Sequence, residues 1–146
     1  MRIVAIGIAL LALAGVGVAQ DATKKEMAQL EGEWTMVSGE RDGQAVPDEM
    51  RKTAKRVVKD GETTVEIGSQ LFMKAKFTID PAKKPKAIDY TMTGGPNDGK
   101  KVLGIYELDG DTVKFCFAAP DKDRPTEFAA KEGSGWTLSV WKRAKK

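Results

Sequence analysis

Acidic side chains on the predicted strands come nearest to a catalytic pattern in this chain. Asp89, Glu107 and Glu127 each stand in or beside a predicted strand. A glycosidase needs two carboxylates that face each other across a cleft, one of them with a raised pKa. The sequence does not set the separation of these three, and a chain with 21 acidic residues contains some pair in any case. A carboxylate-based hydrolase acting on an envelope or extracellular glycan is therefore an alternative function only, and we assign no catalytic residue.

Two other ligand-binding patterns are incomplete. Predicted turns carry oxygen ligands at Asn97, Asp98, Asp109 and Asp111. No stretch has the alternating ligands and distal glutamate of an EF-hand loop. The glycines and lysine of residues 94–100 lack the Gly-Lys-Ser/Thr ending and the following helix of a phosphate-binding loop. We predict no bound metal and no cofactor.

Missing residue types exclude whole classes of site. The chain has no histidine and one cysteine. Without imidazole, Ser-His-Asp and Cys-His nucleophile pairs, His-ligated zinc and a histidine pH switch cannot form. A single thiol also forms no intrachain disulfide. Cys116 stands between Phe115 and Phe117, so we expect a small buried hydrophobic residue rather than a nucleophile. Whether the chain is an enzyme stays open, and a non-enzymatic function is preferred.

The N-terminus has the pattern of an export signal. Arg2 precedes an apolar run from Ile3 to Val18, and small residues at Gly17 and Ala19 suit a signal-peptidase site. We predict a signal peptide over residues 1–19, cleaved after Ala19, and a periplasmic or secreted protein. The run of about 16 residues is shorter than the roughly 20 that a spanning helix needs, so a retained anchor is the weaker alternative.

The remaining chain suits one all-β domain. Residues 20–29 form a leader that is either mobile or a short helix, residues 30–143 form the domain, and residues 144–146 form a basic tail. Stretches rich in Val, Ile, Thr, Phe, Tyr and Trp recur between turn signals, which is typical of a sandwich or barrel. We predict eight or nine mostly antiparallel strands, at residues 33–39, 56–59, 62–67, 71–79, 87–93, 102–108, 112–118, 126–131 and 136–143.

Turn and helix signals divide these strands. Asp60-Gly61 and Asp109-Gly110 are dipeptides that tolerate the positive φ of tight hairpin turns. Pro47–Lys52 has a proline at a helix start, acids behind it and bases further on, so we expect one short helix there, acting as a lid or plug.

Alternation predicts which faces are buried. Leu71, Met73, Ala75, Phe77 and Ile79 are apolar while the residues between them are mostly polar, as in a strand with one wet face. In the strand at residues 102–108, both faces are apolar. We expect the short helix to cover the second face, with the leader or a partner protein as alternatives.

Two sets of residues resemble known families. Gly32-x-Trp34 on the first strand and Arg143 at the end of the last resemble the lipocalin barrels, in which the tryptophan plugs one end and the arginine packs across it. Residues 83–89, 94–100, 104–111 and 124–128 are similar to an uncharacterised exported domain that is abundant in planctomycetes. The resemblance covers about residues 30–143 and implies a lipocalin-like antiparallel barrel in an envelope or secreted protein, with no activity to carry over.

The motifs of the resemblance have structural interpretations. Gly104 removes a side chain from a crowded inward position, so that the barrel bends or the Trp34 indole approaches. Asp109 and Gly110 make a turn. Arg124 and Glu127 surround a rigid strand start at Pro125, where we expect Arg124 to form a structural ion pair with Glu127, Asp89 or Glu107.

The function predicted from the sequence is binding. Aromatic side chains are the candidate lining of a small-molecule cavity, and they are Trp34, Phe77, Tyr106, Phe115, Phe117 and Trp136. We expect a non-enzymatic module that binds a small apolar or amphipathic ligand or an envelope partner, with a structural docking domain as a further alternative. An enclosed apolar volume of about 300 Å³ or more would favour a ligand, and a solid interior would favour docking.

Charge points to no particular partner. Cleavage after Ala19 would remove one of the 24 basic residues and none of the 21 acidic ones, leaving a formal charge of +2. We therefore expect the lysine and arginine clusters to be solvent-exposed surface residues, with binding to an anionic envelope surface as the alternative. Export argues against nucleic acid, and we expect a monomer with no membrane span after cleavage.

Overall fold

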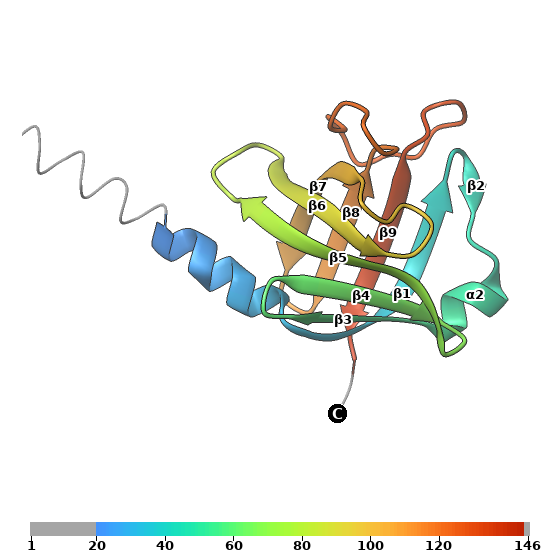
Figure 1. The fold of residues 1–146 in the computed structure, drawn as a ribbon, viewed down its shortest axis with the longest axis horizontal. Helices are drawn as coiled ribbons and strands as arrows, with labels where there is room; N and C mark the ends of the chain where they lie inside the picture. Colours follow the sequence, from blue (N-terminus) through green and yellow to red (C-terminus); the bar gives the residue numbers. More distant parts are fainter. Residues whose placement is uncertain (1–19, 145–146) are drawn as a thin grey trace, which may run out of the picture.

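Eight antiparallel strands close into a barrel (Figure 1). The computed structural model describes residues 20–144, so the predicted signal peptide lies outside the described residues. The barrel strands are β1 (Gly32–Arg41), β3 (Ala54–Lys59), β4 (Glu62–Ile67), β5 (Gln70–Asp80), β6 (Lys86–Gly94), β7 (Lys101–Asp109), β8 (Thr112–Phe117) and β9 (Thr137–Arg143). Each pairs with the next along the chain, and β9 pairs with β1 to close the sheet. The all-β antiparallel barrel predicted from the sequence is confirmed.

Tight turns form at the two predicted hairpins. Asp60 and Gly61 join β3 to β4 with φ of 52° and 75°, the positive values that a two-residue hairpin loop requires. Between β7 and β8, Asp109 pairs with Thr112, so the loop residues are Gly110 and Asp111. Of these two, Gly110 has the positive φ, 59°.

The interior follows the predicted alternation with one exception on β5. Met73, Ala75 and Phe77 are buried. Leu71 is 52% exposed, because a bulge opposite Val65 and Glu66 shifts the register at the start of the strand. An extra residue in one strand reverses the inward and outward positions beyond it.

A long connection covers the outer face of β7 and β8. Ile105 and Cys116 lie opposite each other on these strands and are buried outside the barrel core. The chain between β8 and β9 returns over them: Ala130 is buried, and the Cys116 thiol donates a hydrogen bond to the Ala129 carbonyl oxygen at 3.1 Å. The expectation that the short helix covers this face is wrong, and so is the predicted strand at residues 126–131.

The short helix after the first strand forms where the sequence predicts it. Helix α2 (Asp48–Thr53) has acids in its first turn and bases in its last, which suits the helix dipole. None of its residues is buried, so it does not plug the barrel. The two-residue strand β2 (Gln44–Ala45) precedes it and pairs with the end of β1.

A second helix, over residues 20–30, leads into β1. It shows that the leader forms a short helix, one of the two states expected. Among the described residues, no helix has the length and apolar character to cross a membrane.

Replacing Gly104 with alanine should destabilise the barrel by about 1–3 kcal/mol, the usual cost of overpacking. A Cβ atom at Gly104 would collide with the Phe117 ring on the paired strand. The matched control is Gly94→Ala on β6, where the nearest atoms, in the Lys74 and Leu71 side chains, lie at 3.3 and 3.4 Å. Urea denaturation measures both variants, and equal losses of stability would contradict the steric explanation.

Candidate functional site

Trp34 and Arg143 close one end of the barrel together. The Trp34 side chain is fully buried, and its Nε1–H donates to the Leu30 carbonyl oxygen at 2.9 Å. The guanidinium carbon of Arg143 lies 4.3 Å from the centre of the Trp34 ring. Arg143 also donates to the carbonyl oxygens of Gln29 and Glu31, at 2.8 and 2.9 Å. A cation over an indole face with satisfied donors is a stable arrangement, and it ties the end of the N-terminal helix to β9.

The absence of a side chain at Gly32 leaves room for the Arg143 guanidinium. Its φ is +126°, and a Cβ atom there would lie 3.2 Å from Arg143 Nη1. Both facts favour glycine at this position.

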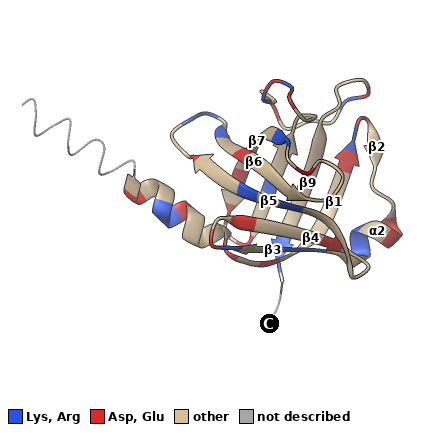
Figure 2. Ribbon diagram, viewed as in Figure 1, with Lys and Arg blue, Asp and Glu red and all other residues tan. Residues whose placement is uncertain are grey.

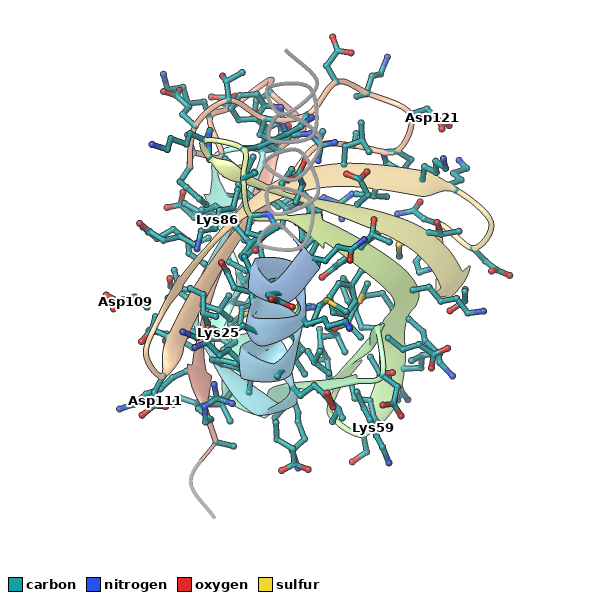
Figure 3. All side chains as sticks on the ribbon, turned by 90° about the vertical axis from the view of Figure 1, so that its left-hand side faces the viewer. Lys25, Lys59, Lys86, Asp109, Asp111 and Asp121 are labelled. Carbon is teal, nitrogen blue, oxygen red and sulfur yellow. The ribbon has the colours of Figure 1, made fainter. Side chains whose placement is uncertain are left out.

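Hydrogen bonds to the Glu26 side chain hold the N-terminal helix against the strands. The Glu26 carboxylate accepts hydrogen bonds from Lys86 Nζ at 2.7 Å and from the Tyr106 hydroxyl at 3.0 Å. Leu30 is buried in the core, and Met27 packs against it. Figure 3 looks at this end of the molecule, where the helix stands across the front of the barrel with Lys86 to one side. The helix and Trp34 therefore seal this end.

An arginine lies inside the barrel, and the sequence analysis did not single it out. Arg56 is 5% exposed. Its Nη1 donates to Thr63 Oγ1 at 2.8 Å and to the Tyr90 hydroxyl at 2.9 Å. Its guanidinium carbon lies 4.7 Å from the Phe115 ring centre and 4.5 Å from the Trp141 ring centre. The cation is thus enclosed by two hydroxyls and two aromatic faces.

Arg56 has no acidic partner in the described part of the chain. None of the ion pairs found there includes it, and its Nε is buried without a hydrogen-bond acceptor. The alternation of inward and outward residues along β3 could have identified Arg56 as an inward residue, because Ala54, Arg56 and Val58 occupy successive inward positions.

The six aromatic residues predicted to line a cavity separate into two groups. Trp34, Phe77, Tyr106 and Phe115 belong to the buried core and Phe117 packs against it. Trp136 lies in the β8–β9 connection, partly exposed and outside that core. The core tryptophan that the sequence analysis missed is Trp141, buried on β9 with its Nε1–H donating to Ser139 Oγ at 2.9 Å. Its inward position follows from its place two residues after buried Ser139.

Side chains fill the interior around Arg56. A void of about 10 Å³ lies beside Thr63 and Tyr90. Its walls also include Leu30, Val58, Phe77, Ile88 and Phe115. This is room for roughly one water molecule, far below the approximately 300 Å³ at which small-molecule pockets begin.

The three acids considered for catalysis lie in separate ion pairs. Asp89 pairs with Arg124 at 2.6 Å. Glu107 pairs with Lys114 at 3.5 Å, and Glu127 pairs with Lys131 at 3.6 Å. A carboxylate pair facing across a cleft is not formed by these residues. Residues 20–144 also contain no cluster of acids and cysteine that suits a metal ion.

Arg124 fastens the connection between β8 and β9 to strands β6 and β7. Of the three acidic partners that the sequence allowed for Arg124, the structure shows an ion pair with Asp89. Arg124 also donates hydrogen bonds to the carbonyl oxygens of Ile88 and Gly104, at 3.2 and 2.9 Å. A polar hollow of about 100 Å³ lies beside this pair. The atoms nearest to a Cβ built at Gly104 belong to the Phe117 ring and the Cys116 carbonyl group, so the absent side chain leaves room for Phe117.

Apolar side chains are exposed at the opposite end, beside α2. Leu71 and Phe72, at the start of β5, are 52% and 45% exposed, and Met50 on α2 is 38% exposed. Helix α2 lies next to the β4–β5 turn (Figure 1). Basic and acidic residues are interspersed along the helices, strands and loops of the described chain (Figure 2).

Two buried acidic groups are held in their neutral forms. Burial, followed by the hydrogen bond and charge of Glu26 and the charge of Asp80, raises the pKa of Tyr106 well above its ordinary value near 10. Burial also raises the pKa of the Cys116 thiol, with a smaller contribution from Glu127, against the opposing hydrogen bond to Ala129. A raised thiol pKa lowers the thiolate fraction, which agrees with an inert Cys116.

Comparison with protein-family models, with curated proteins and with solved structures finds no match to this chain.

Replacing Trp34 with alanine should lower the free energy of unfolding by about 3–5 kcal/mol, because it leaves a cavity under Arg143 and removes the hydrogen bond to Leu30. Urea denaturation measures the change. A loss below about 1 kcal/mol would show that the indole does not support the barrel end.

Tyr106 should make stability fall in alkaline solution. Below its unfolded pKa near 10 the phenol is neutral in both states, and its stabilising contribution is complete. Above that pH the unfolded phenol ionises while the folded one does not, so the free energy of unfolding decreases as pH rises. We expect a shallower decrease between about pH 9.5 and 11 in Tyr106→Phe than in the parent protein, measured by urea denaturation. Parallel pH profiles would contradict the raised pKa.

Proposed function

We propose that the protein is a non-enzymatic docking module, exported to the bacterial envelope or beyond, that binds a partner protein through the α2 end of its barrel. The surface in question consists of Met50, Leu71 and Phe72. The observation that carries the proposal is the exposure of two consecutive apolar residues, Leu71 and Phe72, on a strand whose next inward residues are buried. Adjacent exposed apolar side chains are typical of interaction sites.

The contrast between the two barrel ends supports this surface. The other end is sealed by Trp34, Arg143 and the N-terminal helix, and the Leu30 and Met27 side chains of that helix are used for internal packing. Leu71 owes its outward position to the bulge opposite Glu66, and bulges commonly re-aim side chains at functional edges.

Export and family are parts of the same proposal. The apolar run at residues 3–18 supports a signal peptide. The Trp34–Arg143 stack supports the resemblance to lipocalin barrels, and the remaining motifs support a relationship with the exported planctomycete domain. An amphipathic small ligand is less well supported, since the void beside Thr63 is about 10 Å³.

Photo-crosslinking tests the docking surface directly. A photoreactive phenylalanine analogue replaces Phe72 in one variant, and Val57 in the matched control. Val57 is 38% exposed on the outer face of β3. After irradiation in the cells that naturally express the protein, we expect a discrete protein adduct from position 72 and none from position 57.

Native mass spectrometry of the same protein, purified gently from its own envelope, distinguishes the alternatives. Loss of the co-purifying protein in a Leu71→Ser, Phe72→Ser double variant, with the barrel still folded, supports docking. A small-molecule mass would instead favour the ligand-binding interpretation. A bare monomer together with no adduct at position 72 would rule out this surface.

A further inference from the structure

A polar hollow lies where the β5–β6 turn and the β8–β9 connection come together. Its volume is about 100 Å³, several times the space that one water molecule needs. In contrast to the void in the core, most of the surface that it exposes is polar. The charged residues of its wall are Asp80, Lys83, Asp89 and Arg124. Two carboxylates and two cationic groups therefore border one small space.

Two of these charges are paired with each other and two are not. Asp89 and Arg124 form an ion pair at 2.6 Å. Asp80 and Lys83 are exposed, and among residues 20–144 neither takes part in an ion pair. Opposite charges that line one hollow without contacting each other leave both charges available to a third group.

The strand register brings the two carboxylates to the same face of the sheet. Asp80 lies opposite Ala87, and Thr78 lies opposite Asp89, so the two acids are diagonal neighbours across β5 and β6. Diagonal neighbours on paired strands are roughly 7 Å apart, which leaves room for one ammonium group between their carboxylates. Asp89 Oδ1 is buried beside Arg124 while the Asp89 side chain is 48% exposed, so its second oxygen remains available to a ligand.

The two cationic groups supply hydrogen-bond donors to the same hollow. The Arg124 contacts described above all use its Nη1 atom, and a guanidinium carries further N–H groups on Nε and Nη2. The Lys83 ammonium group has three N–H donors. A carboxylate accepts strong hydrogen bonds from both kinds of donor.

The balance of charge limits the class of ligand. A simple anion would be repelled by Asp80 and Asp89, and a simple cation would be repelled by Lys83 and Arg124. A molecule that carries both an ammonium and a carboxylate group finds a partner for each. The volume allows roughly five or six non-hydrogen atoms, which is the size of the smallest α-amino acids.

We propose that this hollow binds a small zwitterion of the α-amino acid class. Asp80 and Asp89 receive the ammonium group of the ligand. Lys83 and Arg124 bind its carboxylate. The bound zwitterion links the β5–β6 turn to the β8–β9 connection, which Arg124 fastens. The site lies at the end of β5 opposite to Leu71, so it is separate from the docking surface.

Titration of isotope-labelled protein with glycine tests the site by NMR spectroscopy. We expect saturable shifts of backbone amide signals at residues 78–89 and 124, with a Kd of about 1 mM. Acetate and methylammonium each carry one of the two charges, so at equal ionic strength each should bind at least about tenfold more weakly. Trimethylglycine carries both charges but has no N–H group to donate, and it should bind as weakly as acetate.

Variants of the two unpaired charges locate the effect. Asp80→Asn and Lys83→Gln should each weaken glycine binding by about tenfold. Asparagine keeps an oxygen that accepts from the Ala82 N–H, as Asp80 Oδ1 does at 3.2 Å, so the turn is preserved. The matched controls, Asp98→Asn and Lys100→Gln, change exposed residues between β6 and β7 and should bind glycine like the parent protein.

Three results would overturn the proposal. One is the absence of saturable shifts at about 20 mM glycine, roughly twentyfold the expected Kd. Another is equal binding of acetate and glycine, because the hollow would then be a simple anion site. The third is glycine binding that stays unchanged in both Asp80→Asn and Lys83→Gln. None of these results bears on the docking surface, which the crosslinking experiment tests separately.

Discussion

Closure of the sheet between β1 and β9 is the constraint on which the rest of the structure depends. It places Trp34 opposite Arg143, and the stacked guanidinium then reaches the carbonyl oxygens that end the N-terminal helix. An open sheet would leave two unpaired edges and an apolar face in water. Once closed, the barrel converts the alternation along each strand into an inner core and an outer surface, so one pairing determines the environment of side chains on all eight strands.

The two ends of the barrel differ because different parts of the chain meet them. At one end, the helix over residues 20–30 supplies Leu30 and Met27 to the core, and Glu26 fastens it to β6 and β7. At the other, α2 contributes no buried residue, and the bulge at the start of β5 turns Leu71 outward. Apolar surface is therefore used internally at the sealed end and left in solvent at the α2 end, which is why docking is proposed there.

The interior combines dense packing with an unbalanced charge. A buried arginine among aromatic rings is compatible with a stable fold when its donors are satisfied and its charge is compensated. Arg56 meets the first condition for one nitrogen, which donates to Thr63 and Tyr90, while its Nε has no hydrogen-bond acceptor among residues 20–144. Small voids in apolar cores are ordinary, and the void beside Thr63 and Tyr90 exposes only apolar surface, with Arg56 outside its wall.

Local signals in the sequence determined much of this protein: the antiparallel barrel, the Asp60-Gly61 turn and the short helix at Pro47–Lys52. These depend on strand periodicity, turn chemistry and dipole preferences, which neighbouring residues establish by themselves. Tertiary structure alone decided that the β8–β9 connection covers the second apolar face and that Arg56 forms no ion pair with the acidic residues of the described chain. Both depend on which distant segments share a surface, and periodicity identifies an apolar or inward face without specifying what packs against it.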